Sequence, residues 1–142
     1  MSLVYSHLLS IYEKRGGIYA VLLDPDKKNH GIIESMVAQA NESDVDALFV
    51  GGSLMMDGRY AERVKRIKDA ARIPVIFFPG GVGQLNSHYD AMLFMSVISG
   101  RNPHYLIGEQ VIAAPVVKDL GIETIATGYM ILDGGVGSTV EF

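Results

Sequence analysis

The sequence predicts an α/β protein built around a parallel sheet, and three observations lead to that fold class. Short apolar runs alternate with longer amphipathic stretches along the chain. These runs are continuously apolar, as expected of parallel strands that are covered on both faces. Glycine, hydroxyl or acidic residues follow four of the five runs, whereas the opposite ends are plainer. With 142 residues, the chain is expected to form a single domain, 1–142.

The apolar runs give the predicted strands. They are expected at 18–23, 46–50, 74–78, 91–95 and 123–127, and the last strand extends towards 132 if it is long. Repeated strand–helix–strand units with right-handed crossovers produce a parallel sheet.

The amphipathic stretches give the predicted helices, at 3–14, 31–42, 58–72 and 101–121. Asn102 and Pro103 have the residue types of a helix start, Gly121 of a helix end, and Pro115 is expected to kink or split the last helix. In 58–72 the apolar stripe consists of Ala61, Val64, Ile67 and Ala71, and the solvated face of Arg63, Lys65, Arg66 and Lys68.

Two architectures fit this pattern. One is a (β/α)₈ TIM-barrel-like fold, present here as an incomplete barrel of about five βα units. The other is a flavodoxin-like open sheet, complete at this length, that serves as a phosphate- or metal-binding domain. The tail "GYMILDGGVGSTVEF" carries no helix to cover the last strand, which favours the incomplete barrel.

Composition excludes several function classes. The chain has no cysteine, a formal charge of −4 and no basic stripe, which argues against a disulfide scaffold and a nucleic-acid partner. No apolar run reaches the ~18 residues of a membrane span, and the N-terminus lacks signal-peptide features. These features predict a cytoplasmic protein.

The stretch "AVLLDPDKK" places two acids directly after the first predicted strand. Asp24 and Asp26 supply the oxygen ligands that Mg²⁺ prefers, together with substrate phosphates. Lys27 is positioned to contact a phosphate. The alternative is a plain turn in which the Asp-Pro-Asp sequence caps the next helix.

Glycines follow the second and third strands. Gly51-Gly52-Ser53 has the composition of an anion-binding loop, or of an ordinary strand-to-helix turn with a serine cap. The glycine-rich loop 80–86 lacks both Walker and dinucleotide-binding spacing. Met92, Met95 and Met130 are expected to be core residues or to line an apolar channel. The histidines have no metal-ligand spacing, and no nucleophile elbow is present.

Five segments in order resemble one enzyme family: "LLDPDK", "FVGGS", "FFPGGVGQLN", "DAMLFMSVISGRNPHYLIGEQVIAAP" and "TGYMILDGG". They resemble geranylgeranylglyceryl phosphate synthases and related prenylglyceryl phosphate synthases, in the branch shared by some archaea and Bacteroidetes-like bacteria. The resemblance begins at about residue 15 and covers nearly all of the remaining chain.

The resemblance implies a modified TIM barrel that transfers a prenyl group from a prenyl diphosphate to sn-glycerol 1-phosphate, forming an ether-lipid precursor with Mg²⁺ as cofactor. It implies Asp24 and Ser53 as metal ligands. The residues expected to bind substrate are Asp26, Lys27, Gly51, Gly52 and Tyr129. A homo-oligomer and a peripheral membrane contact for the lipid product are further expectations.

Two departures from the family pattern matter. Some members have a lysine where this chain has Leu22, which removes one phosphate contact. The family's acceptor site lies on later strands, so the resemblance implies that the chain is the N-terminal three-fifths of the enzyme. Its catalytic residues are then expected beyond Phe142, and the 142 residues alone are expected to be inactive. Another phosphate-binding barrel enzyme, such as a phosphosugar isomerase, is a weaker alternative.

Overall fold

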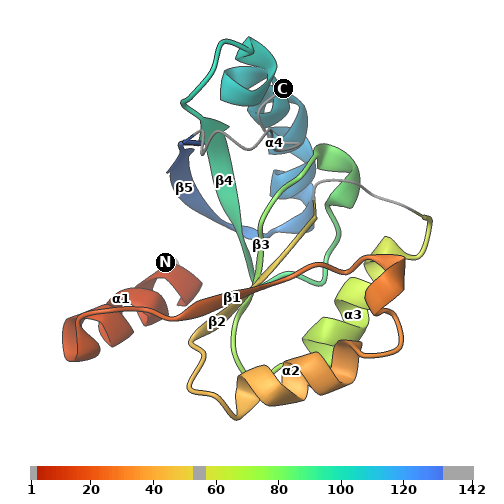
Figure 1. Cartoon of the computed structure of the whole chain (residues 1–142). Coiled ribbons are helices and arrows are strands. Elements are labelled where there is room, and N and C mark those ends of the chain that lie inside the picture. Colours follow the sequence, from red (N-terminus) through yellow and green to blue (C-terminus); the bar gives the residue numbers. More distant parts are fainter. Residues whose placement is uncertain (1–2, 53–56, 133–142) are drawn as a thin grey trace.

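A computed structural model describes residues 3–52 and 57–132. It shows one sheet of five parallel strands, with helices on both of its faces (Figure 1). The strands are β1 (Ala20–Leu23), β2 (Ala47–Val50), β3 (Val75–Phe77), β4 (Ala91–Val97) and β5 (Glu123–Tyr129). The helices are α1 (Leu3–Arg15), α2 (Ile33–Asn41), α3 (Tyr60–Ala70) and α4 (Glu109–Leu120), with short turns η1 (Lys27–Asn29), η2 (Val82–Gln84) and η3 (His104–Gly108).

The strand order separates the two predicted architectures. The strands lie side by side in chain order, β1-β2-β3-β4-β5, and every neighbouring pair is parallel. In a flavodoxin-like sheet the strand order reverses at a switch point, which gives the order 2-1-3-4-5. The flavodoxin-like alternative is therefore wrong, and the fold is that of an incomplete (β/α)₈ barrel.

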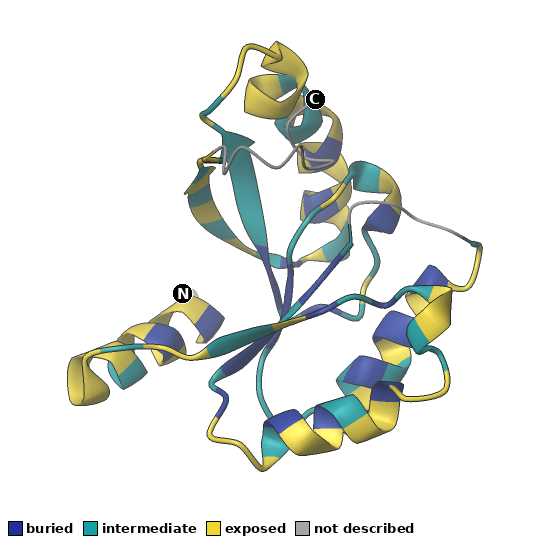
Figure 2. Cartoon of the chain, in the orientation of Figure 1, coloured by how far each residue is buried: buried dark blue, intermediate teal, exposed yellow. Residues whose placement is uncertain are grey.

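Alternate residues of the strands form two cores. One core lies between the sheet and helices α2, α3 and α4, and includes Val50, Phe77 and Met92 (Figure 2). The other lies on the opposite face, where Val4 and Leu8 of α1 pack on small or apolar side chains at the beginnings of three strands. The buried strand residues in this second core are Ala47, Ile76 and Ala91.

Acids at the amino ends of the strands have structural partners. The carboxylate of Glu123, at the start of β5, accepts hydrogen bonds from the backbone amides of Val4 and Tyr5, each at 2.8 Å. Asp46 accepts from the amide of Tyr19, and Asp90 from the amide of Val75. These bonds fasten the amino ends of the strands, so the acids there serve stability.

The predicted helices are present, but their details differ. Arg63, predicted on the solvated face of α3, is buried, and so is Tyr60, whereas Ala61 is exposed. Pro115 does not split α4, which is continuous; the irregular segment is instead the π-turn η3 before it. Gly121 ends the helix as predicted, with φ of 67°. No helix in the described part of the chain is long and apolar enough to cross a bilayer.

Candidate active site

The carboxyl ends of the first three strands meet in one place. Leu23, Val50 and Phe77, which end these strands, are register partners. The residues that follow them therefore lie side by side at the same edge. This edge carries Asp24 after β1, the Gly51-Gly52 pair after β2 and the loop 78–84 after β3.

Glycines allow these loops to touch. A Cβ on Gly52 would lie 2.5 Å from Oδ1 of Asp24, so the carboxylate rests against the Gly52 backbone. A Cβ on Gly80 would lie 2.1 Å from the carbonyl oxygen of Gly52, and one on Gly51 would lie 1.8 Å from that of Phe78. A side chain on Gly51 or Gly80 would overlap with a backbone carbonyl, which explains glycine at these two positions, whereas one on Gly52 would have to displace the Asp24 carboxylate.

Gln84 joins the second and third loops. Its side chain is 4% exposed. Nε2 donates to the carbonyl of Gly52 at 2.7 Å, while Oε1 accepts from the amide of Gly80 at 3.0 Å. One amide thus fixes the position of the glycine loop that touches Asp24. Nothing in the sequence indicates that this residue, among the glycines of its loop, is buried.

The surroundings of Asp24 fit a magnesium ion. The backbone carbonyl of Asp24 accepts a hydrogen bond from Asn29 Nδ2 at 2.8 Å. The residue is half-buried, and its carboxylate faces Gly52. The described residues contain no cluster of three metal-ligating side chains. Mg²⁺ ordinarily takes one or two carboxylates and completes its octahedron with water and substrate phosphates, so a single carboxylate beside a backbone loop suits it. Ser53, the other predicted ligand, lies outside the described residues.

The remaining residues of the acidic motif are directed elsewhere. Asp26 caps η1, because its Oδ1 accepts from the backbone amide of Lys28 at 2.9 Å. The turn interpretation therefore describes Asp26 well, and its predicted contact with substrate stays a prediction. Lys27 is exposed at the start of η1, and its positive charge helps to lower the pKa of Asp57.

Arg63 lies near the candidate site, and its predicted exposure to solvent is wrong. The periodicity of α3 placed it in water, but its side chain is 2% exposed. Its Nε donates to the carbonyl of Pro25 at 2.5 Å, and Nη2 to Oδ1 of Asp57 at 2.7 Å. These hydrogen bonds to Arg63 are the main reason that the pKa of Asp57 is lowered. A periodic pattern cannot reveal this role, because Pro25 lies 38 residues away and Asp57 precedes the helix whose pattern is considered.

Two buried phenols lie beneath the site. The hydroxyl of Tyr89 lies 3.2 Å from that of Tyr60 and 3.3 Å from the carbonyl of Gln84. Burial raises the pKa of Tyr60 to about 12, and the negative charge of Asp24 adds to the rise. Burial also raises the pKa of Tyr89. Both phenols are therefore neutral at physiological pH.

Tyr129, a predicted substrate-binding residue, ends β5. Its ring packs edge-on against Phe78, with centroids 5.7 Å apart, and Phe78 in turn lies 5.9 Å from Phe49. Tyr129 therefore belongs to an aromatic cluster with the first residue after β3. This cluster brings the end of β5 towards the glycine loops.

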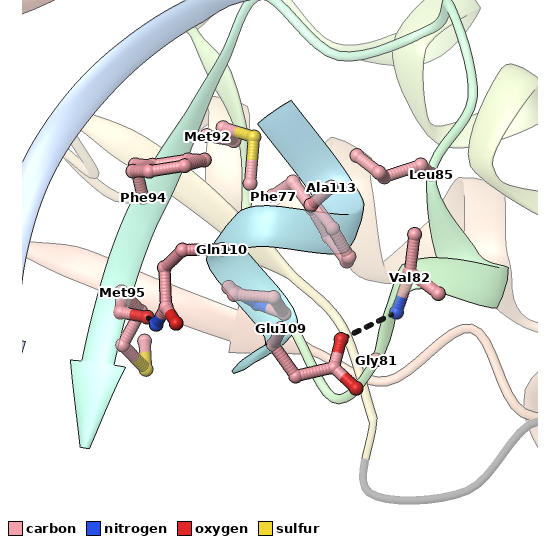
Figure 3. Close-up of a pocket in the computed structure, with 11 residues that line it drawn as sticks. Phe77, Gly81, Val82, Leu85, Met92, Phe94, Met95, Glu109, Gln110 and Ala113 are labelled. Atoms are coloured by element: carbon pink, nitrogen blue, oxygen red, sulfur yellow. Dashed lines mark hydrogen bonds between the residues drawn. The ribbon is translucent and has the colours of Figure 1, made fainter. Parts of the chain in front are cut away.

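An apolar pocket adjoins the glycine loops (Figure 3). It lies among β3, β4, the loop around η2 and helix α4. Pro79 and Gly81 line it and flank Gly80, which contacts Gly52. Met92 is a buried core residue, as one of the two interpretations predicted, and it lines the pocket together with Met95; Met130 is exposed and is not among the lining residues. The other apolar walls are Phe77, Val82, Leu85, Phe94 and Ala113.

Glu109 closes one side of this pocket. Its Oε2 accepts from the backbone amide of Val82 at 3.2 Å (Figure 3), and its Oε1 lies 2.8 Å from Nε2 of His104. The side chain thereby links the η2 loop to the start of α4. The pocket consequently has a polar rim next to the glycine loops and an apolar interior.

Comparison with known proteins agrees with this arrangement. Over 139 residues the chain is 42% identical to a geranylgeranylglyceryl phosphate synthase of Chitinophaga pinensis, covering 98% of this chain and 55% of that protein. It is 39% identical over 128 residues to the synthase of the same name from Thermococcus kodakarensis, covering 88% and 51%. The chain thus spans about half the length of the curated relatives it matches.

Solved structures give the same result. The wild-type GGGPS from Thermoplasma volcanium superposes with a TM-score of 0.84 at 29% identity, over 96% of this chain and 54% of that one. The (S)-3-O-geranylgeranylglyceryl phosphate synthase from Thermoplasma acidophilum, solved with its substrate sn-glycerol-1-phosphate, gives 0.83 at 28% identity, over 96% and 55%. The profile of the PcrB family matches residues 9–140, and the chain therefore belongs to the PcrB family.

Proposed function

We propose that the complete protein is a Mg²⁺-dependent prenyltransferase that moves a geranylgeranyl or other prenyl group from its diphosphate to sn-glycerol 1-phosphate. One observation carries this proposal. The carboxylate of Asp24 rests against Gly52, and the same loops border an apolar pocket across Gly80 and Gly81. A prenyl diphosphate has a charged head and an apolar tail, which match these two neighbouring environments.

The reaction breaks the allylic C–O bond, and its electron pair leaves with the diphosphate. The glycerol hydroxyl oxygen forms the new ether bond to the same carbon and loses its proton. Asp24 and Ser53 would hold the magnesium ion, which supplies neutralisation of charge on the leaving group. Gly51 and Gly52 carry no side chains, so backbone can approach the phosphates closely.

Part of the prenyl tail is proposed to enter the apolar pocket, whose volume of about 40 Å³ is too small for the whole tail. Phe77, Met92 and Phe94 present apolar surface there, and methionine adapts to irregular shapes. Contact with these side chains removes the tail from water and fixes the reactive carbon near the glycine loops. Such positioning accounts for a large part of the rate in two-substrate reactions.

The acceptor is proposed to be sn-glycerol 1-phosphate, the substrate named for the Thermoplasma acidophilum structure. Tyr129 is proposed to contact substrate, because its ring lies beside Phe78 at the same edge. Asp26 and Lys27 keep their predicted substrate contacts as proposals. The catalytic residues are unassigned, and the 142 residues alone are proposed to be inactive.

The decisive experiment is a prenyl-transfer assay on the complete gene product that contains this sequence. We expect a prenylglyceryl phosphate product with prenyl diphosphates of at least one chain length. Activity should disappear with EDTA and return with Mg²⁺. The enantiomer sn-glycerol 3-phosphate serves as the control acceptor. Absence of product with every chain length from geranyl upwards would contradict the proposal, and turnover by residues 1–142 alone would contradict the inactivity of this part.

The expectations of self-association, a peripheral membrane contact and a cytoplasmic location remain proposals. Exposed apolar residues on η3 and α4 support a surface contact, since Ile107 and Val111 are 61% and 73% exposed. Sedimentation velocity on the complete gene product tests self-association, and flotation with lipid vesicles tests the membrane contact. Fractionation of cells tests the location.

A further inference from the structure

We infer that Arg63 is a positioning residue that holds the Asp24 carboxylate in place for the metal and the diphosphate. This inference rests on the proposed function, and it adds a residue that contacts none of the reacting groups. The following observations concern what the guanidinium binds, which peptide groups it fixes and how it connects two loops.

The guanidinium of Arg63 is almost fully buried and uses both sides of its fork. Nη2 and Nη1 donate to the two carboxylate oxygens of Asp57, at 2.7 and 3.3 Å, while Nε donates to the carbonyl of Pro25 at 2.5 Å. A planar, rigid fork of donors is the feature that distinguishes arginine from lysine. Lysine can satisfy these acceptors only partly.

The bond to Pro25 fixes the peptide group between Pro25 and Asp26, directly after the one that follows Asp24. Pro25 is itself fully buried, and its ring restricts φ. The carbonyl of Asp24 is held by Asn29 Nδ2 at 2.8 Å, and the next carbonyl, that of Pro25, is held by Arg63. Two consecutive peptide groups are therefore anchored. They fix the backbone from which the Asp24 carboxylate extends.

The bond to Asp57 anchors the start of α3. Asp57 lies three residues before this helix, in the connection from β2. Arg63 therefore ties the loop that carries Asp24 to the residues that begin α3. Movement of the Asp24 loop relative to α3 would change the distance between the Asp24 carboxylate and the Gly52 backbone, which is the contact that the metal site needs.

Burial of a charge is an inefficient way to gain stability. Removing a guanidinium from water costs several kcal/mol, and apolar replacements of buried ion pairs are often neutral or stabilising. A role in geometry explains why a charged fork, and not an apolar side chain, occupies this place under the site.

The test compares variants of the complete gene product: R63K, R63M and D57N. The control is R59Q, because Arg59 precedes the same helix but its exposed guanidinium pairs with Glu62 on the surface. Binding of Mn²⁺ alone is measured by electron paramagnetic resonance, and thermal unfolding is recorded on the same samples. Kinetics then give the Mg²⁺ activation constant and the KM for each substrate.

We expect R63K and R63M to weaken Mn²⁺ binding by about 10-fold or more, as for other residues that orient metal ligands. D57N should cause a smaller shift in the same direction. The KM for the prenyl diphosphate should rise while that for sn-glycerol 1-phosphate stays unchanged, and R59Q should behave as wild type. If R63M does not fold, R63K and D57N decide the question.

Folded R63K and D57N proteins that bind Mn²⁺ as wild type does would overturn the inference. Equal rises in both KM values would also overturn it, since they would indicate general loosening. A wild-type protein that transfers no prenyl group would instead contradict the proposed function. The two failures are therefore distinct.

Discussion

The side-chain amide of Gln84 donates a hydrogen bond to the backbone carbonyl of Gly52 at 2.7 Å. This bond joins the loops after the second and third strands. It fixes the backbone against which Asp24 rests, so it connects a buried side chain to the geometry of the site.

Replacement of Gln84 by leucine should lower both stability and metal affinity. The substitution removes the hydrogen-bond partner of the half-buried Gly52 carbonyl and of the Gly80 amide, and each lost hydrogen bond costs about 0.5–1.5 kcal/mol. Urea unfolding measures the loss. The control Q39L changes the same residue type on the exposed side of α2 and should stay within about 0.5 kcal/mol of wild type. Equal stability of Q84L and Q39L would contradict the burial of this amide.

A methyl group on Gly52 should displace the Asp24 carboxylate. Its Cβ would lie 2.5 Å from Oδ1, so one of the two groups must move. We expect G52A to fold but to weaken Mn²⁺ binding by about 10-fold or more. The control G31A meets no atom within 4 Å. Unchanged affinity in G52A would show that the metal does not use this carboxylate in the observed position.

The two acids of the motif should respond differently to amidation. D24N removes the proposed ligand charge and should reduce transfer by about 100-fold or more, because metal-assisted charge stabilisation is worth several kcal/mol. D26N keeps a side-chain oxygen that can cap η1, since asparagine caps as well as aspartate, and should change stability by less than about 0.5 kcal/mol. A kinetic and unfolding comparison of the two variants checks the assignment. A larger loss of activity in D26N would reverse the roles given to them.

Truncation of Glu123 should destabilise the protein without changing substrate affinity. In E123A the amides of Val4 and Tyr5 lose their acceptor, so α1 loses its attachment to β5. A hydrogen bond to a charged acceptor contributes about 1.5–3 kcal/mol to stability, and this is the upper limit of the loss for each of the two bonds. Hydrogen exchange should show faster opening of α1. Unaltered exchange in this helix would contradict the anchoring role.

Stability should fall in alkaline solution because of Tyr60. Its pKa is raised by burial to about 12, above the value near 10 of an exposed tyrosine. The unfolded chain therefore releases this proton first, and the contribution of Tyr60 to stability, complete below pH 10, decreases as pH rises to about 12. Unfolding measured between pH 9 and 12 should show a shallower decline in Y60F than in wild type. Identical slopes would mean that Tyr60 titrates normally.

The sequence predicted the strands well because each is a compact apolar run. All five exist, although β4 continues to Val97, beyond its predicted end; β5 ends at Tyr129, within the longer extent towards 132 that was predicted for it. The extra residues of these two strands pair through their backbones, and the apolar pattern of the sequence does not reveal that pairing. The choice between barrel and open sheet depends on strand order, which the pattern alone does not contain.

The candidate site was predicted only in part. Asp24 and Gly52 were recognisable because acids and glycines after strands are uncommon without a reason. Arg63 and Gln84 were not, since a charged residue in an amphipathic helix and an amide in a glycine loop both look solvated. Their partners lie 38 and 32 residues away, so only the folded chain reveals them.

The order of the strands also has a consequence for synthesis on the ribosome. Each strand pairs with the one made just before it, so successive units can dock as they emerge, without waiting for distant sequence. The exception is the bond from Glu123 to Val4, which spans 119 residues. The first helix packs on β2, β3 and β4 through Val4 and Leu8, but its N-terminal amides gain their acceptor only when β5 has been made, so its attachment is completed last.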